Sequence, residues 1–167
     1  MPFHILYTGC MNKWIVHTPL GAMALVESGG KITHLFLQAA QAPAGLEEKQ
    51  TPLLRRAAKE LEAYFAGKRQ HFDLPLAPEG TAFEQQVWKL LRSIPYGHTC
   101  TYGDLARRLN SPRAARAVGG ACHRNPLPIF IPCHRVVGAG GKLTGYAGGL
   151  KRKRYLLEME NSQKAAL

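Results

Sequence analysis

Residues 101–122 of this 167-residue chain read TYGDLARRLNSPRAARAVGGAC, and this stretch decides which fold we expect for the C-terminal half. Thr101, followed three residues later by Asp104, is a capping pattern that starts a helix. Asn110 then turns the chain, and the Ser-Pro pair at 111–112 starts a second helix that runs to the end of the stretch. Two short helices joined by a tight turn indicate a helix-turn-helix.

The second helix contains two adjacent glycines, Gly119 and Gly120. Each glycine costs a helix about 1 kcal/mol relative to alanine, so small size rather than helix propensity explains them. Either a nucleic acid approaches the helix closely, with Arg113 or Arg116 reaching into a groove, or the helix packs tightly against another part of the protein. The basic surroundings favour the nucleic acid.

The N-terminal half predicts a different kind of structure. Strand-like runs around the hairpin signal Gly29-Gly30 predict a small antiparallel β-sheet, with strands at 14–17, 22–26 and 32–37. Helical spacing predicts one helix from Thr51-Pro52 to just before Gly67, and another from the capping pair Thr81 and Glu84 to Pro95. A last helix is expected from about Leu150.

These elements predict an α+β protein with two domains. A proline-containing segment at 73–80 has the composition of a linker, so we place the boundary near residue 80. The expected division is 1–80, a small antiparallel sheet with a helix, and 81–167, a mostly helical domain containing the helix-turn-helix.

The charge of the chain also divides near residue 80. The formal net charge is +11, but residues 1–80 hold 8 Lys and Arg against 7 Asp and Glu, whereas residues 81–167 hold 14 against 4. Such a concentrated positive field suits a nucleic acid or an anionic membrane surface, and also a merely solubilising surface. No apolar run is long enough to cross a bilayer, so we expect a soluble intracellular protein with no membrane partner.

A second motif concerns a thiol. The apolar run Ile129–Ile131 predicts a strand that leads through Pro132 to Cys133, which is followed by a histidine and an arginine. A cysteine attacks as its thiolate, and a neighbouring cation or histidine lowers its pKa, so this thiol is a candidate nucleophile. The glycine-rich segment 138–149 can bring backbone N–H groups near a ligand.

The cysteines do not indicate a metal or a disulfide framework. The four of them contain no CxxC pair, and the two Cys-His dipeptides, at 122–123 and 133–134, match no familiar zinc spacing. We therefore expect reduced thiols, no metal and no cofactor.

Taken together, RAVGGA at 116–121, Asn125-Pro126, PCHRV at 132–136 and TGYAGGL at 144–150 closely resemble the O6-alkylguanine-DNA alkyltransferase family. The resemblance covers about residues 81–160, with a weaker likeness at 18–21. It implies a ribonuclease H-like N-terminal domain and a winged helix-turn-helix-like C-terminal domain. It also implies an activity, the irreversible transfer of an alkyl group from O6-alkylguanine in DNA to a cysteine of the protein, once per molecule.

The resemblance assigns the catalytic residues. Cys133 is the nucleophile and alkyl acceptor, and His134 is its base, acting through a water molecule. Glu160 orients the histidine. Asn125 ties the helix pair to the active-site segment through backbone hydrogen bonds.

The resemblance also assigns contacts to DNA and to the flipped guanine. Tyr102 bonds the flipped base and helps rotate its phosphate, and Arg116 fills the space that the base leaves in the duplex. The residues implied to contact DNA are Tyr102, Arg113, Ala115, Arg116 and Gly119, and those implied to line the pocket are Pro128, Val136, Tyr146 and Ala147. Some family members carry serine where this chain has Ala147, so only the backbone N–H of that residue can serve O6.

The expected partner is double-stranded DNA containing O6-alkylguanine, bound through the minor groove by a monomer, in the cytoplasm or the nucleus. Cooperative binding along DNA and activity on O4-alkylthymine are left open. Three alternatives remain: a non-catalytic protein that binds alkylated DNA, a regulator that reads sequence, and a cysteine hydrolase. The thiol argues against the first alternative, and the few long polar side chains of the second helix argue against the second.

Overall fold

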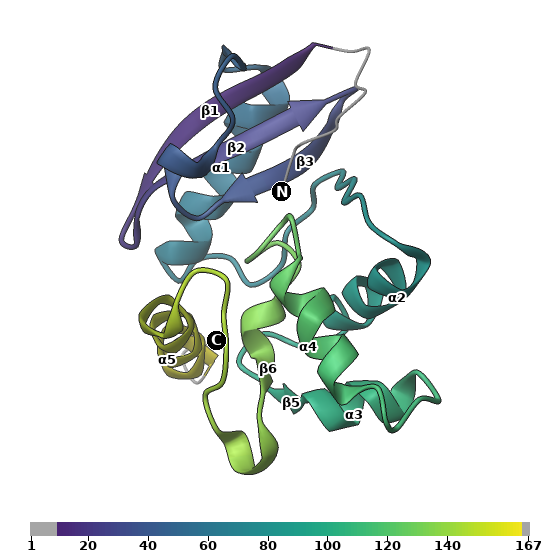
Figure 1. The fold of residues 1–167 in the computed structure, drawn as a ribbon. Helices are drawn as coiled ribbons and strands as arrows, with labels where there is room; N and C mark the ends of the chain where they lie inside the picture. Colours follow the sequence, from purple (N-terminus) through teal and green to yellow (C-terminus); the bar gives the residue numbers. More distant parts are fainter. Residues whose placement is uncertain (1–9, 165–167) are drawn as a thin grey trace.

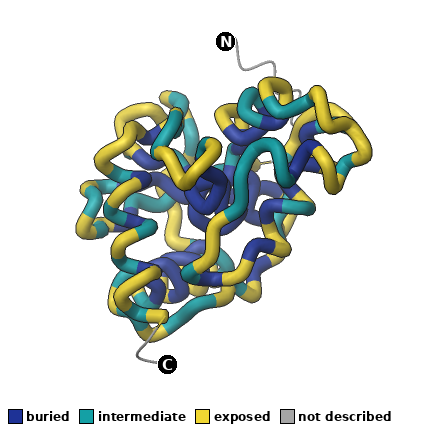
Figure 2. The backbone as a smooth tube through the Cα atoms, turned by 90° about the horizontal axis from the view of Figure 1, so that it is seen from below, coloured by how far each residue is buried: buried dark blue, intermediate teal, exposed yellow. Residues whose placement is uncertain are grey.

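The computed structural model describes residues 10–164, which form a sheet unit (residues 10–65) and a helical unit (residues 82–164), shown in Figure 1. The predicted α+β fold, with a small N-terminal sheet and a mostly helical C-terminal part, is confirmed. One cluster of buried apolar side chains extends through both units. In Figure 2 the buried stretches lie in the interior of the molecule and the exposed stretches around it.

The sheet unit is built on an antiparallel meander. It consists of β1 (Met11–Thr18), β2 (Gly21–Ser28) and β3 (Lys31–Phe36), and the two-residue strand β4 (Glu47–Glu48) pairs with β1 in parallel, giving the order β3-β2-β1-β4. Gly29 and Gly30 turn the second hairpin with φ of 59° and 76°, the left-handed region that glycine adopts without strain. The three predicted strands are therefore confirmed: β1 and β2 extend beyond the expected 14–17 and 22–26, and β3 is shifted by one residue from the expected 32–37.

Helix α1 (Pro52–Phe65) packs against β1, β2 and β3. As predicted, the Thr51 side chain caps it, accepting from the Leu54 N–H at 3.1 Å, and Gly67 follows its end with φ of 73°. Its buried face ends with Tyr64, whose ring is fully covered. This last turn therefore brings a polar aromatic group to the side of the sheet unit that meets the helical unit.

The helical unit contains α2 (Ala82–Leu91), α3 (Tyr102–Arg108), α4 (Ala115–His123) and α5 (Leu150–Lys164). Both predicted capping boxes form, Thr81 with Glu84 on α2 and Thr101 with Asp104 on α3. Since α3 and α4 pack against each other after a short turn, the helix-turn-helix pattern is present.

The predicted start of α4 is wrong by a turn. The helix begins at Ala115 rather than at the Ser-Pro pair, and the chain before it forms a separate turn closed by the Ala114 N–H and the Ser111 carbonyl at 2.8 Å. The physical reason is that Asn110 takes a left-handed φ of 55°, and the Ser111 hydroxyl donates back to the Leu109 carbonyl instead of capping α4.

The predicted strand at Ile129–Ile131 is also wrong. Ile129 has a left-handed φ of 75°, and the Ile131 N–H bonds the Leu127 carbonyl at 2.8 Å, so this apolar run is a buried turn. Prolines on either side of it lack the N–H that a ladder needs. The ladder forms after the cysteine, where β6 (Val136–Val137) pairs in parallel with β5 (Cys100–Thr101), and neither short strand was predicted.

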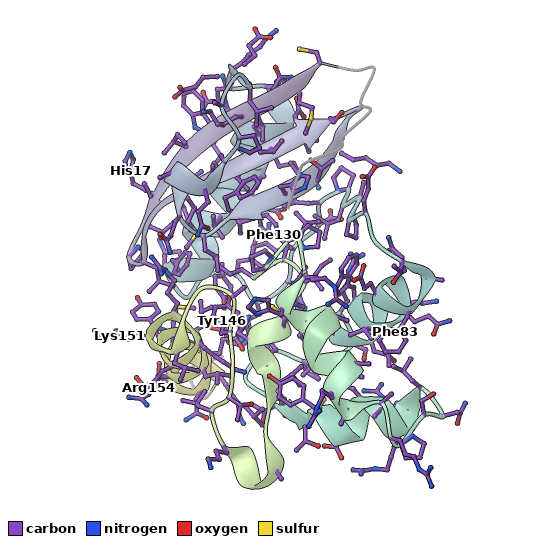
Figure 3. All side chains as sticks on the ribbon, viewed as in Figure 1. His17, Phe83, Phe130, Tyr146, Lys151 and Arg154 are labelled. Carbon is purple, nitrogen blue, oxygen red and sulfur yellow. The ribbon has the colours of Figure 1, made fainter. Side chains whose placement is uncertain are left out.

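The two units are joined by hydrogen bonds as well as by the shared core. On the outer edge of β3, Leu35 N–H donates to the Pro126 carbonyl at 2.9 Å, and Ile32 bonds the connecting segment at Pro75 and Ala77, at 2.8 and 2.9 Å. Phe130 lies where the helical unit meets the sheet unit (Figure 3). None of the helices described for residues 10–164 has the length and apolar character needed to span a bilayer.

Candidate active site

The thiol of Cys133 lies at the wall of a cavity of about 250 Å³ inside the helical unit. The residue begins a short 3-10 helix, Cys133–Arg135, which follows the buried turn, and it is 4% exposed. The cavity is bounded by both helices of the helix-turn-helix and by the glycine-rich loop, through Tyr102, Gly119, Cys122, His123, Cys133, Thr144, Gly145, Tyr146 and Ala147. The Cys133 thiol therefore lies beside the helix-turn-helix, a motif suited to binding nucleic acid.

The sequence predicted a lowered pKa for this thiol, and that prediction is wrong for the structure described. Burial raises the pKa of Cys133 from 9.0 to about 11, although a hydrogen bond from Asn125 and the charge of Lys153 oppose the rise. The guanidinium of Arg135 does not help because it is turned toward Glu160. At neutral pH the resting thiol is therefore protonated, and a base must remove its proton before it can attack.

His134 is fully buried and its Nε2 lies 2.7 Å from Oε1 of Glu160. Because a carboxylate only accepts, Nε2 carries the hydrogen and Nδ1 keeps its lone pair. Burial lowers the pKa of His134, although the Glu160 carboxylate opposes this, so the ring is neutral at neutral pH. Nδ1 has no hydrogen-bond partner within residues 10–164, which leaves it able to accept a proton.

Glu160 is the most heavily bonded group of the site. Besides His134 it accepts from the Tyr64 hydroxyl at 2.7 Å, from the Gly97 N–H at 3.2 Å, and from Arg135 through Nε at 3.0 Å and Nη2 at 2.9 Å. Burial alone would raise the pKa of Glu160, but the hydrogen bonds from His134 and Arg135 and the positive charge of Arg135 outweigh it and hold that pKa below 4.5. The carboxylate therefore stays ionised.

Asn125 is buried and bridges the segment after α4 to the buried turn. Its side chain donates to the Ile131 carbonyl at 2.8 Å and accepts from the Leu127 N–H at 2.9 Å. These are backbone hydrogen bonds of the kind that the resemblance implied for this residue. They fix the turn that leads into Cys133.

Lys153 belongs to the site although the sequence did not single it out. Its Nζ is buried and donates to the carbonyls of Thr144 and Gly145 at 2.8 and 3.1 Å, and it lies 3.4 Å from the Tyr102 hydroxyl. It thereby clamps the glycine-rich loop against α3. Nothing in the run KRKR distinguishes it from Lys151 and Arg154, which project outward from α5 in Figure 3; only the position of the helix on the loop does.

The glycine-rich loop carries Tyr146, which lies between α5 and the rest of the helical unit in Figure 3. Its hydroxyl, like that of Thr144, is buried without a hydrogen-bond partner within the described residues. The loop packs tightly against Leu37, the residue after β3, because a Cβ at Gly148 would lie 2.5 Å from a methyl of Leu37 and 3.0 Å from the Tyr146 ring. Two residues that line the cavity thus carry hydroxyls that have no hydrogen-bond partner among the described residues.

The geometry around the two glycines of α4 differs. A Cβ on Gly119 would lie 3.8 Å from the Tyr102 ring, an ordinary contact, so tight internal packing is not the reason for that glycine. A Cβ on Gly120 would lie 3.1 Å from the guanidinium of Arg124, which pairs with Glu84, so close packing within the protein accounts for the second glycine. Gly119 borders the cavity, where a larger side chain would occupy the space that a ligand needs.

The structure brings some of the expected site residues together and leaves others apart. Tyr102, Gly119, Tyr146 and Ala147 border the cavity of Cys133. Val136 is buried in β6, and Pro128 borders a separate cleft of about 350 Å³ between the two units. On the helix-turn-helix, Arg113 and Arg116 are exposed and Ala115 is half-buried.

A helix-turn-helix that borders a cavity with a buried thiol, backed by a His–Glu pair, defines a class: proteins built to present a cysteine nucleophile to a nucleic acid. The comparisons with known proteins agree. Residues 8–78 match the family model for the ribonuclease-like domain of 6-O-methylguanine DNA methyltransferase, and residues 82–162 match the model for its DNA binding domain. The chain belongs to the 6-O-methylguanine DNA methyltransferase family, and the resemblance stated from the sequence is confirmed.

Similar proteins match this chain over nearly their whole length and are named methylated-DNA–protein-cysteine methyltransferases. The methylated-DNA–protein-cysteine methyltransferase of Methanosarcina barkeri is 49% identical over 89% of this chain and 96% of its own. The constitutive enzyme of that name from Bacillus subtilis is 47% identical over 86% and 91%. A crystal structure of Mycobacterium tuberculosis OGT in complex with DNA has a TM-score of 0.84 and 44% identity, over 91% of this chain and 94% of that one.

Proposed function

We propose that this chain repairs alkylated DNA by moving the alkyl group from O6 of a guanine to the sulfur of Cys133, once per molecule. The observation that carries the proposal is the cavity in which this thiol lies, bordered by Tyr102 and Gly119 of the helix-turn-helix. The family and its methyltransferase relatives support the reaction type. A base must leave the duplex to reach a thiol buried in this way.

In the proposed reaction His134 acts as a base through one water molecule. Its Nδ1 lone pair receives the proton of the Cys133 thiol, while Glu160 accepts the hydrogen bond from Nε2 and stabilises the imidazolium that forms. The thiolate attacks the alkyl carbon in line, so an S–C bond forms as the C–O6 bond breaks. The electron pair of that bond leaves with the guanine, which regains a proton, and the thioether that remains is inert.

The helix-turn-helix is proposed to bind duplex DNA through the minor groove. Arg116 is exposed one helical turn before Gly119, on the same face of α4, and is therefore placed to enter the stack where the base has left. Tyr102 contacts the flipped nucleotide, and Arg113, Ala115 and Gly119 lie against the backbone. The +10 charge difference between Lys plus Arg and Asp plus Glu in residues 81–167 supports this partner.

Within the cavity, Tyr146 and the backbone N–H of Ala147 are proposed to contact the guanine, with carbonyls of the Cys133–Val136 segment accepting from its amino group. Pro128 and Val136 support that wall. We further propose a monomer that divides into domains 1–80 and 81–167, works without metal or cofactor, and is found where the chromosome is, in the cytoplasm or a nucleus.

The test is intact-protein mass spectrometry after incubation with duplex DNA containing one O6-methylguanine, followed by peptide mapping. We expect a gain of one CH₂ on Cys133 and none in the Cys133→Ala variant, which should still bind the DNA. Cys122→Ala is the matched control because Cys122 also borders the cavity, but burial raises its pKa to about 12. Transfer that survives in Cys133→Ala would refute the proposal, and tight binding without transfer by the unaltered protein would favour a damage-recognition protein.

A further inference from the structure

The carboxylate that holds His134 is itself held by a residue of the other unit. Tyr64, in the last turn of α1, donates its hydroxyl to Oε1 of Glu160 at 2.7 Å. Among the hydrogen-bond donors to this carboxylate, Tyr64 is the one that comes from the sheet unit; the Gly97 N–H, His134 and Arg135 belong to the helical unit. The sheet unit thus contacts the candidate catalytic network directly.

The hydroxyl of Tyr64 is not required for packing. Its ring is fully buried and lies 5.3 Å from the Phe72 ring and 6.1 Å from the Tyr96 ring, measured between centroids, which a phenylalanine could do equally well. A buried hydroxyl costs folding free energy unless it is hydrogen-bonded, and this one bonds Glu160. The bond to the carboxylate is therefore what the tyrosine adds over phenylalanine.

Oε1 of Glu160 receives more donors than it has lone pairs. The Tyr64 hydroxyl and His134 Nε2 each lie 2.7 Å from it, and Arg135 Nη2 lies at 2.9 Å. Donors that share one oxygen compete for its two lone pairs, so Tyr64 both fixes the carboxylate and limits how strongly it can bond the Nε2 hydrogen of His134. Loss of the hydroxyl would strengthen the His134 bond and stabilise the imidazolium.

We propose that Tyr64 is a positioning residue for alkyl transfer, which acts through Glu160 on the base His134 and makes the reaction depend on the docked sheet unit. The proposal rests on the function proposed above, because it needs His134 to act as the base. The other ionisable groups that face this network are Tyr96 from the segment before β5, Arg135 from the 3-10 helix, Cys133, Tyr146 from the glycine-rich loop, and Lys153 from α5.

The test is the pH profile of single-turnover transfer from free O6-benzylguanine, which needs no DNA binding. We expect the acidic limb of Tyr64→Phe to move to higher pH by about 0.7 of a unit, since a lost hydrogen bond is worth about 1 kcal/mol and one pKa unit about 1.4. The sign follows because a more stable imidazolium stays protonated to higher pH, where it cannot accept the thiol proton.

Tyr96→Phe is the matched control. Its hydroxyl is also buried beside Arg135 and the Tyr64 ring, but it has no hydrogen-bond partner within residues 10–164. We expect its pH profile to match that of the unaltered protein. An unmoved limb in Tyr64→Phe, or an equal shift in Tyr96→Phe, would overturn the proposal.

A double-mutant cycle keeps the test decisive if Tyr64→Phe changes both rate and stability. In a Glu160→Gln background the Tyr64→Phe change should alter the transfer rate less than twofold, because its path to His134 is already broken. Full additivity would overturn the positioning role. Failure of the unaltered protein to label Cys133 at all would instead refute the proposed function, so the two failures are distinguishable.

Discussion

The two sides of His134 differ in how completely their polar groups are satisfied. On the Nε2 side, Glu160 accepts from four residues, one of them in the other unit, and only the nearby Tyr96 hydroxyl is buried there without a partner within residues 10–164. On the other side of the ring, Nδ1 is buried without a partner within the described residues, and so are the hydroxyls of Thr144 and Tyr146, two residues that line the cavity. We call the Nε2 side the closed side, because its hydrogen bonds form when the protein folds. We call the other side the open side, because a substrate and a water molecule would supply the missing hydrogen-bond partners.

The difference between the two sides affects the stability of the folded protein. Unbonded buried polar atoms cost about 1–3 kcal/mol each, so the open side is retained at the expense of stability. The hydrogen bonds of the closed side stabilise the folded protein and fix the tautomer of His134. Substitutions on the closed side should therefore lower both the free energy of unfolding and the rate of transfer. Substitutions on the open side should slow transfer without lowering the free energy of unfolding.

The largest effect is expected from Glu160→Ala. It leaves Arg135 buried without its carboxylate and Tyr64 without an acceptor, so the free energy of unfolding should fall by about 3–5 kcal/mol. Urea titration followed by fluorescence measures it, and transfer should be lost in the same variant. A loss below 1 kcal/mol would mean that the closed side is not the stabilising one.

The next effect concerns acid stability. The pKa of Glu160 is held below its ordinary 4.5 in the folded protein, so its contribution is complete above that pH and is lost as the pH falls toward the folded value. The free energy of unfolding should therefore drop more steeply between about pH 5 and 2 in the unaltered protein than in Glu160→Gln. Parallel slopes in the two proteins would contradict the shifted pKa.

Arg116, exposed on the helix-turn-helix, lies outside both sides of His134, so Arg116→Ala should affect DNA repair and leave the chemistry at Cys133 intact. Repair of O6-methylguanine in duplex DNA should slow about tenfold, because unstacking the base costs a few kcal/mol that the intruding side chain offsets. Transfer from free O6-benzylguanine should change less than twofold. Arg154→Ala, on the outward face of α5 in Figure 3, removes the same charge and should leave both rates close to normal. Equal losses on both substrates would rule out the intruding role.

The smallest effect is expected for Tyr146→Phe. Removing a hydroxyl that is unpartnered in the free protein should leave the free energy of unfolding unchanged or raise it by up to about 1 kcal/mol, while transfer slows about threefold to fivefold. Thermal unfolding and single-turnover rates measure the two. A loss of stability would show that this hydroxyl already has a partner in the free protein.

Much of the fold could be predicted because its signals are local. The caps at Thr51, Thr81 and Thr101 and the turn at Gly29-Gly30 involve residues within four positions of each other, and all of them form. The prediction of a strand at Ile129–Ile131 is wrong because the apolar composition fits a strand, while Asn125 and the flanking prolines impose the left-handed φ of Ile129.

The candidate site depended on contacts far apart in the sequence. Glu160 was named through the family resemblance, since no local pattern joins it to a histidine 26 positions earlier. Tyr64 is 96 positions from Glu160, and Lys153 resembles its exposed neighbours in every respect except where the helix places it. The predicted pKa of Cys133 is wrong for the same reason. Arg135 is close to Cys133 in the sequence but is turned toward Glu160, and the burial of the thiol cannot be read from the sequence.

The bonds along the outer edge of β3 have a further consequence for the protein in concentrated solution. An uncovered edge strand invites pairing with another chain, and here the backbone at Pro75, Ala77 and Pro126 occupies it. The helical unit, through Pro126, thus also protects the sheet from aggregation. Residues 10–80 produced alone would expose the Leu35 N–H and the apolar surface beneath it, and would be expected to associate with themselves.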